Sequence, residues 1–295
     1  MNTSQSRPAK AADVKGMDSH ENSFSSVMLM PHPRLADLVD SYWVLRGQAD
    51  PTVGQASMYP LGYPMIEFNL GDRWIKNASG GAPAGAIDSN IMTMSPRPLS
   101  IRPLGRIHTA LARLHPLALY KLMGTEVGVS PVLEAEAVFG RCFRETLEQL
   151  DSSAQPARIK QVLDRFFLNA FTRSRLVIDR RIQYLLGQII THRGTLSLRD
   201  AAGELGLSQK RIEQLFGQHV GLSPKAFAGI ARFQYVLAAY RPEVDLTTLG
   251  QIAGFYDQSH FIRHFKKLAH CPPRTFFAQK FGPTHRISNL YNFSR

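Results

Sequence analysis

Hydrophobic residues recur at helical spacing along the last two-fifths of the chain. In RRIQYLLGQIITHRG (180–194) the apolar positions 182, 185, 186, 189 and 190 form one stripe, and Gly194 is a stop signal. The same kind of pattern continues through residues 196–224, 225–240 and 245–273. We therefore expect an all-helical C-terminal domain.

Two blocks of this region, 196–224 and 245–273, resemble each other. Each contains a short helix of about eight residues, a turn glycine (Gly206 or Gly254), and a second helix with an apolar face that ends in phenylalanine. The glycines lie 48 positions apart, whereas Phe216 and Phe265 lie 49 apart, so the second copy has one extra turn residue. A helix-turn-helix needs a small residue where its helices cross, a glycine able to adopt positive φ in the turn, and apolar residues that hold the second helix in place. The sequence therefore predicts a duplicated helix-turn-helix unit.

The first half of the chain has a different pattern. Short apolar segments at 57–60, 65–70 and 91–94 are separated by Gly, Pro and Asn, which is typical of a small β barrel or sandwich. Helical patterns flank these segments, and IKQVLDRFFLNAF (159–171) forms a further amphipathic helix. Its apolar stripe fits either a dimerisation helix or a helix packed onto the β domain. The expected fold class is α+β with two domains.

The expected organisation has five parts. They are a flexible arm (1–26), a β-rich sensor or dimerisation domain (27–150), a linker and connecting helix (151–175), the helical domain (176–282) and a tail (283–295). No run of eighteen apolar residues and no signal peptide is present, so we expect a cytoplasmic protein that does not enter a membrane. The two cysteines, Cys142 and Cys271, are read as free thiols.

The positive charge is concentrated in the C-terminal part. Residues 1–174 carry 18 Lys/Arg and 16 Asp/Glu, a net +2, whereas residues 175–295 carry 17 and 7, a net +10. This balance suits a polyanionic partner whose phosphates are neutralised by lysine and arginine. The plainer interpretation is a basic soluble domain without such a partner.

The outward faces of the two second helices carry polar and cationic residues. With Ile212 and Phe261 as the core directions, a helical step of 100° turns the following side chains outward: Lys210 and Gln214 in the first helix, and Ser259, Ile262, Arg263 and Lys266 in the second. Arginine reads guanine bidentately, serine bonds base edges or phosphate, isoleucine touches a thymine methyl group, and lysine neutralises phosphate. The alternative is that both units are ordinary helical hairpins.

Long ordered strings in this region resemble a known family. GLSQKRIEQLFGQHVGLSPKAF, the ARF of the linker helix and LGQIAGFYDQSHFIRHFKKLAHCPPRTF are similar to the DNA-binding domain of the AraC/XylS family of bacterial transcription regulators. The resemblance implies that each second helix enters one of two successive major grooves. By position, the residues that line the first groove would be Gln209, Lys210, Arg211, Glu213 and Gln214, and those of the second Gln258, Ser259, Ile262 and Arg263. The chain departs from the family pattern at Gly250, usually Ala, and at His270, usually Gly, so a looser second unit and a different turn are expected there.

The N-terminal half resembles the sensor domain of many such regulators more diffusely. YPMIEFNLGDRW (63–74), SPRP (95–98) and HPLALYKLMG (115–124) carry this similarity to a degenerate cupin-like β barrel. Candidate ligand-pocket residues are Tyr59, Tyr63, Glu67, Asn69 and Trp74. The alternative is that the aromatic residues pack the interior and Glu67 is a surface or turn residue.

Metal chemistry is not expected. The only histidines in the N-terminal domain are His32, His108 and His115. His260 and His264 have the spacing of helical metal ligands, but a third ligand is missing nearby and Phe261 stands where a zinc-protease helix would need Glu. No cofactor is expected.

The sequence therefore predicts a non-enzymatic, sequence-specific regulator of transcription that binds double-stranded DNA at the nucleoid. RNA polymerase, a small effector and a second copy of the chain are further possible partners. The alternative is an enzyme of unknown reaction whose basic helical tail docks it to nucleic acid.

Overall fold

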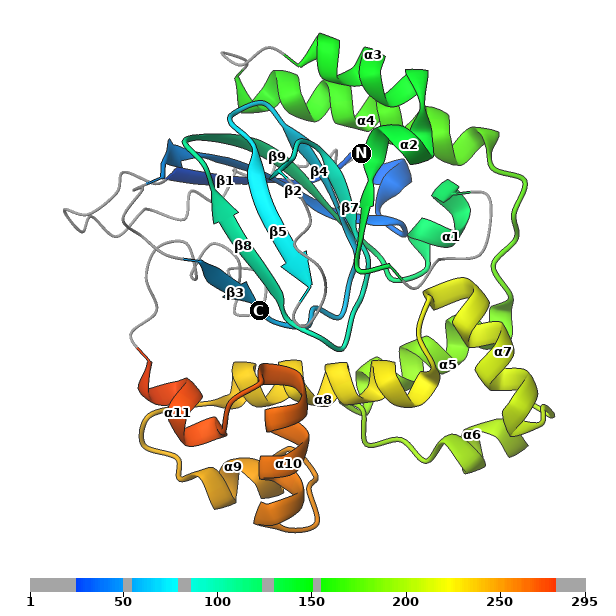
Figure 1. Ribbon diagram of the computed structural model, residues 1–295. Coiled ribbons are helices and arrows are strands. Elements are labelled where there is room, and N and C mark those ends of the chain that lie inside the picture. The colour runs from blue at the N-terminus through cyan, green and yellow to red at the C-terminus, as the bar shows by residue number, and fades with distance from the viewer. Residues whose placement is uncertain (1–24, 50–54, 79–85, 124–129, 151–154, 280–295) are drawn as a thin grey trace, which may run out of the picture.

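The computed structural model describes residues 25–49, 55–78, 86–123, 130–150 and 155–279. Except for Ser25 and Ser26, the predicted arm lies outside these described residues, as does the predicted tail at 283–295. The predicted two-domain α+β fold is confirmed: a β-rich part precedes an all-helical part (Figure 1).

The β-rich part consists of two antiparallel sheets. The larger has the strand order β1 (Ser25–Leu29), β2 (Val39–Gln48), β9 (Arg106–Leu114), β4 (Met65–Asn69), β7 (Asn90–Met92) and β10 (Val132–Glu134). The smaller has the order β3 (Ala56–Met58), β8 (Leu99–Pro103), β5 (Trp74–Ala78) and β6 (Ala86–Ile87). An apolar core that includes Trp43, Met65, Trp74 and Ile101 joins the two sheets. Of the two predicted options, the sandwich is observed and the closed barrel is not.

Helices cover the outer face of the larger sheet. They are η1 (Pro33–Leu35), α1 (Ala118–Met123), α2 (Ala135–Phe139), α3 (Arg141–Gln149) and α4 (Pro156–Arg173). The apolar stripe of α4 is buried in a second core, between these helices and the larger sheet. There Phe166 packs edge-on against Phe68 of the sheet, with ring centroids 5.5 Å apart. The pattern at 159–171 is thus explained by packing within the chain.

The helical part contains two similar units joined by one helix. Its elements are α5 (Arg180–Thr191), α6 (Leu198–Glu204), α7 (Gln209–Val220), α8 (Pro224–Ala239), α9 (Leu246–Ile252), α10 (Gln258–Ala269) and α11 (Pro273–Ala278). Phe227 of α8 belongs to the core of the first unit and Phe233 to that of the second. The turn glycines Gly206 and Gly254 have φ values of 62° and 73°, as the helix-turn-helix pattern requires.

Both departures from the family pattern have a physical explanation. A Cβ atom at Gly250 would lie 3.3 Å from the side chain of Phe261, so glycine lets α9 and α10 approach closely. The expected loosening of this unit stays a prediction. His270 adopts the left-handed conformation itself, with φ 59°, and its amide donates to the carbonyl of Lys266 at 2.9 Å. Histidine thus occupies a conformation that glycine adopts more easily, at a cost of about 1 kcal/mol. The expectation of a turn that differs from the family's stays a prediction.

The helical part packs against the β-rich part at both units. Tyr59, in the segment after β3, lies in the core of the second unit and packs edge-to-face with Phe276, with ring centroids 4.7 Å apart. Tyr120 of α1 stacks obliquely on His219 of α7 with ring centroids 4.2 Å apart. Figure 1 shows α8 running beneath the sheets with one unit toward each end. The side-chain amide of Gln234 on α8 donates to the carbonyl of Pro60.

Candidate nucleic-acid interface

Helix α7 presents a polar face to solvent at its N-terminal end. The helix begins after its N-cap, Ser208, whose hydroxyl accepts from the amide of Arg211 at 3.2 Å. All five predicted contact residues of this helix are exposed: Gln209, Lys210, Arg211, Glu213 and Gln214. Arg211 donates to the amide oxygen of Gln214 at 2.9 Å. This bond orders the guanidinium group along the outer face.

Helix α10 has the more cationic exposed face. Asp257 caps it by accepting from the amide of His260 at 2.7 Å. The predicted contact residues Gln258, Ser259, Arg263 and Lys266 are exposed, and Ile262 is half-buried at the edge of the second core. Exposed charges on α10 are Arg263, Lys266 and Lys267, whereas α7 combines Lys210 and Arg211 with Glu213. Helix α10 therefore attracts a polyanion more strongly than α7 does.

The two histidines of α10 have different environments. His260 is exposed, while the half-buried His264 ring lies 5.1 Å from the ring of Phe255 and 3.2 Å from where a Cβ of Gly229 would be. Burial, and then the positive charge of Arg232, lowers the pKa of His264 to about 4. Within the described residues no three His, Cys, Asp or Glu side chains are grouped as metal ligands would be. The geometry thus makes His264 a neutral packing residue.

Acid is expected to weaken the fold through His264. Its pKa is about 4 in the folded protein and ordinarily 6.5, so the unfolded chain binds the proton first as pH falls. The groups that face it are Arg232, His260 and Lys267, and none of them supplies a negative charge to offset a proton on His264. We expect stability to fall by on the order of 1 kcal/mol between pH 7 and pH 5. The free energy of unfolding measured in urea should depend less on pH for His264→Gln than for the wild type. Equal pH dependences for the two proteins would contradict this.

The five candidate ligand residues of the β-rich part do not converge on one site. Glu67 and Trp74 line a small cavity of about 30 Å³ between the sheets, roughly the room of one water molecule. Tyr59 packs into the second helical unit, and Asn69 closes a turn by donating to the carbonyl of Asp72 at 2.9 Å. Tyr63 lines a separate cavity between the two parts of the chain.

Glu67 is neither the surface nor the turn residue that one interpretation of the sequence expected. Its side chain is buried with 2% of its surface exposed, and its carboxylate binds the Lys76 ammonium group and accepts from the Asn90 amide. Lys76 is also 2% exposed, and its Nζ lies 5.6 Å from the centre of the Trp74 ring. The interior of the sandwich therefore holds a buried polar network around Glu67, in which the amide oxygen of Asn90 has no hydrogen-bond partner among the residues that the structure describes.

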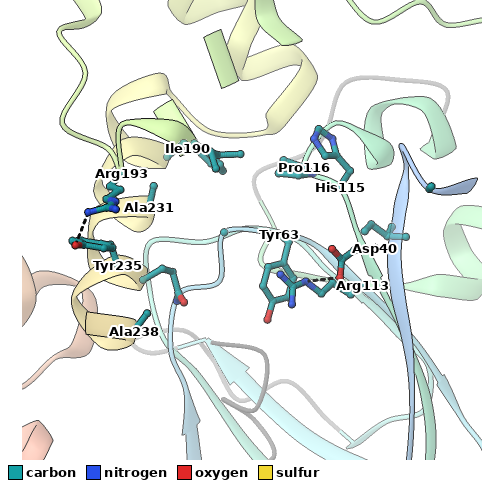
Figure 2. Close-up of a pocket in the computed structure, with 15 residues that line it drawn as sticks. Asp40, Tyr63, Arg113, His115, Pro116, Ile190, Arg193, Ala231, Tyr235 and Ala238 are labelled. Atoms are coloured by element: carbon teal, nitrogen blue, oxygen red, sulfur yellow. Dashed lines mark hydrogen bonds and ion pairs between the residues drawn. The ribbon is translucent and has the colours of Figure 1, made fainter. Parts of the chain in front are cut away.

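A cavity of about 380 Å³ lies between the β-rich and helical parts. Figure 2 shows its two walls. On the first, the guanidinium of Arg113 lies 4.0 Å over the ring of Tyr63 and its Nε is 3.4 Å from Asp40. On the second, Arg193 lies 4.2 Å over the ring of Tyr235 and donates to its hydroxyl at 2.6 Å.

The remaining lining is mostly small or apolar, namely Ala36, Gly62, Leu114, Pro116, Ile190, Phe227, Ala231 and Ala238. Burial lowers the pKa of His115 in the first wall, so its ring is neutral near pH 7. Asp40, Arg113 and Arg193 then leave one net positive charge in the lining. Sequence reasoning missed Arg113 and Arg193, because no local pattern reveals that residues 80 positions apart in the chain face one cavity.

Two segments of the chain match known family models. Residues 201–279 match the model of a helix-turn-helix domain, and residues 27–129 match a domain of unknown function (DUF6597). The predicted AraC-type helix-turn-helix domain at the C-terminus is thereby confirmed. Among curated proteins, no match is found.

Solved structures with a similar fold include ToxT from Vibrio cholerae. One covers 88% of this chain and 99% of its own, with 12% identity and a TM-score of 0.45. Another, with unsaturated fatty acid bound, covers 89% and 96% at 12% identity and a TM-score of 0.43. The AraC-like transcriptional activator CuxR covers 65% and 79%, with 13% identity and a TM-score of 0.24. No helix in the described ranges is long and apolar enough to span a membrane.

Proposed function

We propose that the protein regulates transcription by binding duplex DNA at specific sequences, with α7 and α10 in successive major grooves. The observation that carries the proposal is the pair of exposed recognition faces mounted on the single helix α8. The helix-turn-helix match over 201–279 supports the same function. The activity proposed is binding rather than catalysis.

The exposed side chains divide into those that read bases and those that hold the backbone. Arg263 suits bidentate recognition of guanine, and Ile262 beside it suits contact with a thymine methyl group. Lys266, one turn further along α10, suits a phosphate. On α7, Gln209 and Gln214 are the amide groups that recognise adenine. Both helices therefore combine specificity with electrostatic attraction.

Selection of bound duplexes from a random DNA pool, with the full-length protein, tests this function. Two enriched blocks about 10 base pairs apart are expected, because two grooves on one DNA face are one helical turn apart. Affinity for the selected site should fall steeply as salt rises. A pool that stays random after repeated selection, or binding insensitive to salt, would exclude the proposal.

We further propose that a small acid binds in the cavity between the two parts and modulates DNA binding. The mostly apolar lining suits a hydrocarbon or aromatic body, and Arg113 and Arg193 suit a carboxylate. One wall comes from β2 and β9 and the other from α5 and α8, so an occupant would favour this packed arrangement.

Filling the cavity is expected to abolish this effect. Ala231 lies in the α8 wall, and Ala231→Phe would occupy the space of the ligand. In a panel of aromatic and aliphatic carboxylic acids, we expect at least one to raise the thermal midpoint of the wild-type protein and not that of the variant. Equal shifts in both proteins, or none in the wild type, would contradict the site.

Dimerisation and contact with RNA polymerase remain predictions. The apolar residues of α4, including Ile159 and Leu163, are already buried in the core of the β-rich part. A homodimer would therefore need a surface other than this stripe.

A further inference from the structure

The extra residue of the second helix-turn-helix unit is Tyr256. The two turns close alike: the amide of Leu207 donates to Ala202 at 3.1 Å, and that of Phe255 donates to Gly250 at 3.0 Å. In the first unit the N-cap, Ser208, follows Leu207 directly. In the second unit Tyr256 stands between Phe255 and the N-cap Asp257. The insertion therefore adds one side chain at the entry to α10.

The fold does not use this side chain. Tyr256 is 95% exposed, more than any other large apolar residue in the described part of the chain, whereas Phe255 beside it is 5% exposed. An isolated exposed tyrosine is unremarkable on most surfaces. Here, however, the side chain adjoins the proposed DNA-binding face, with exposed Ser259 and Arg263 in the first turns of the helix it precedes.

Docking geometry then decides what Tyr256 would face. In helix-turn-helix complexes the N-terminal end of the recognition helix contacts base edges, so the preceding turn lies beside the sugar and phosphate groups that border the groove. Tyrosine hydroxyl groups donate to phosphate oxygens in such positions. A large neutral aromatic ring also packs against deoxyribose.

We propose that Tyr256 is a DNA-backbone contact: its hydroxyl donates to a phosphate oxygen at the edge of the groove entered by α10, while its ring packs on the adjoining sugar. This inference rests on the proposed DNA-binding function. The contact adds affinity without reading sequence, because phosphates are alike at every base pair. It also releases no counterion, because the side chain is neutral.

Binding measurements on the full chain with Tyr256→Phe and Tyr256→Ala test the contact. We measure Kd at several salt concentrations for the selected site and for an unrelated duplex. Loss of a hydrogen bond to a charged group predicts roughly tenfold weaker binding for Tyr256→Phe, and a larger loss for Tyr256→Ala. Both DNAs should be affected alike, and the salt slope should stay that of the wild type.

Two further variants serve as controls for the binding measurements. Lys266→Ala should reduce the salt slope by about one, because it removes a cation that neutralises a phosphate. Tyr184→Phe, at a tyrosine on α5 that is 47% exposed, should leave Kd unchanged. Thermal midpoints of both Tyr256 variants should match the wild type, because the side chain packs against so little of the protein.

Three outcomes would overturn the inference. They are wild-type affinity for both Tyr256 variants, an effect of Tyr256→Ala that Tyr256→Phe does not share, and a loss confined to the selected site, which would mean a base contact instead. If Arg263→Ala weakens binding while Tyr256 variants do not, only this inference fails. If the wild-type protein binds no duplex, the proposed function fails with it.

Discussion

Replacing Lys76 by methionine is expected to lower the free energy of unfolding by about 4 kcal/mol. Lys76 and Glu67 are each 2% exposed, and the ammonium group is bonded to the carboxylate within the sandwich. Methionine fills a similar volume but leaves Glu67 with the Asn90 amide alone. An uncompensated carboxylate between apolar sheets keeps its full desolvation cost.

The double variant Lys76→Met with Glu67→Met separates this charge effect from packing. Removal of both charges leaves no unpaired group, so its stability should lie within about 1 kcal/mol of the wild type or above it. Urea unfolding followed by circular dichroism is measured for the wild type, the double variant and both single variants, Lys76→Met and Glu67→Met, and this cycle gives the coupling between the two residues. A Lys76→Met variant as stable as the wild type would contradict this prediction, because the buried carboxylate of Glu67 would then not need the Lys76 ammonium group.

The helical half was the more predictable from sequence because its determinants are local. The stripe at 180–194, the turn glycines Gly206 and Gly254, and the N-cap Ser208 lie within a few residues of the features they specify. The duplication adds a second copy of the same signals. Helical period and capping chemistry therefore sufficed for this half.

The β-rich half was less predictable because its structure depends on distant pairing. Strand β9, RIHTALARL, lies between β2 and β4 at the centre of the larger sheet, yet its composition fits a helix as well as a strand. Lys76 and Glu67 meet across the sandwich from different sheets, which periodicity cannot reveal. For the same reason the cavity was missed.

Helix α8 connects the two predicted activities physically. Its residues contribute to both helix-turn-helix cores, and Ala231, Gln234 and Tyr235 line the cavity on the same helix. A ligand that favours the packing of α8 against the sheets would therefore restrict the movement of both helix-turn-helix units relative to the β-rich part. Such coupling requires that the ligand bind more tightly when α8 is packed against the sheets than when it is not. The cavity would supply the contacts for this difference, because it exists only in the packed arrangement.

Replacing Arg263 by alanine is expected to weaken binding to the selected DNA site by roughly 30- to 100-fold, or about 2 to 3 kcal/mol. Arg263 is exposed on α10, one turn after Ser259, where a recognition helix faces the bases. Binding to an unrelated duplex should weaken only about threefold. There the side chain contributes its positive charge but makes no specific hydrogen bonds to base edges.

Arg274→Ala is the matched control, since it removes the same side chain from the exposed surface of α11, outside both recognition helices. Competition titrations of both variants against the selected and unrelated duplexes give the specificity ratio, which should fall for Arg263→Ala alone. Equal losses on both duplexes would reduce Arg263 to a phosphate contact and transfer base recognition to Ser259 and Ile262. Because alanine at an exposed helical position favours the helix, unfolding of α10 would not account for a selective loss.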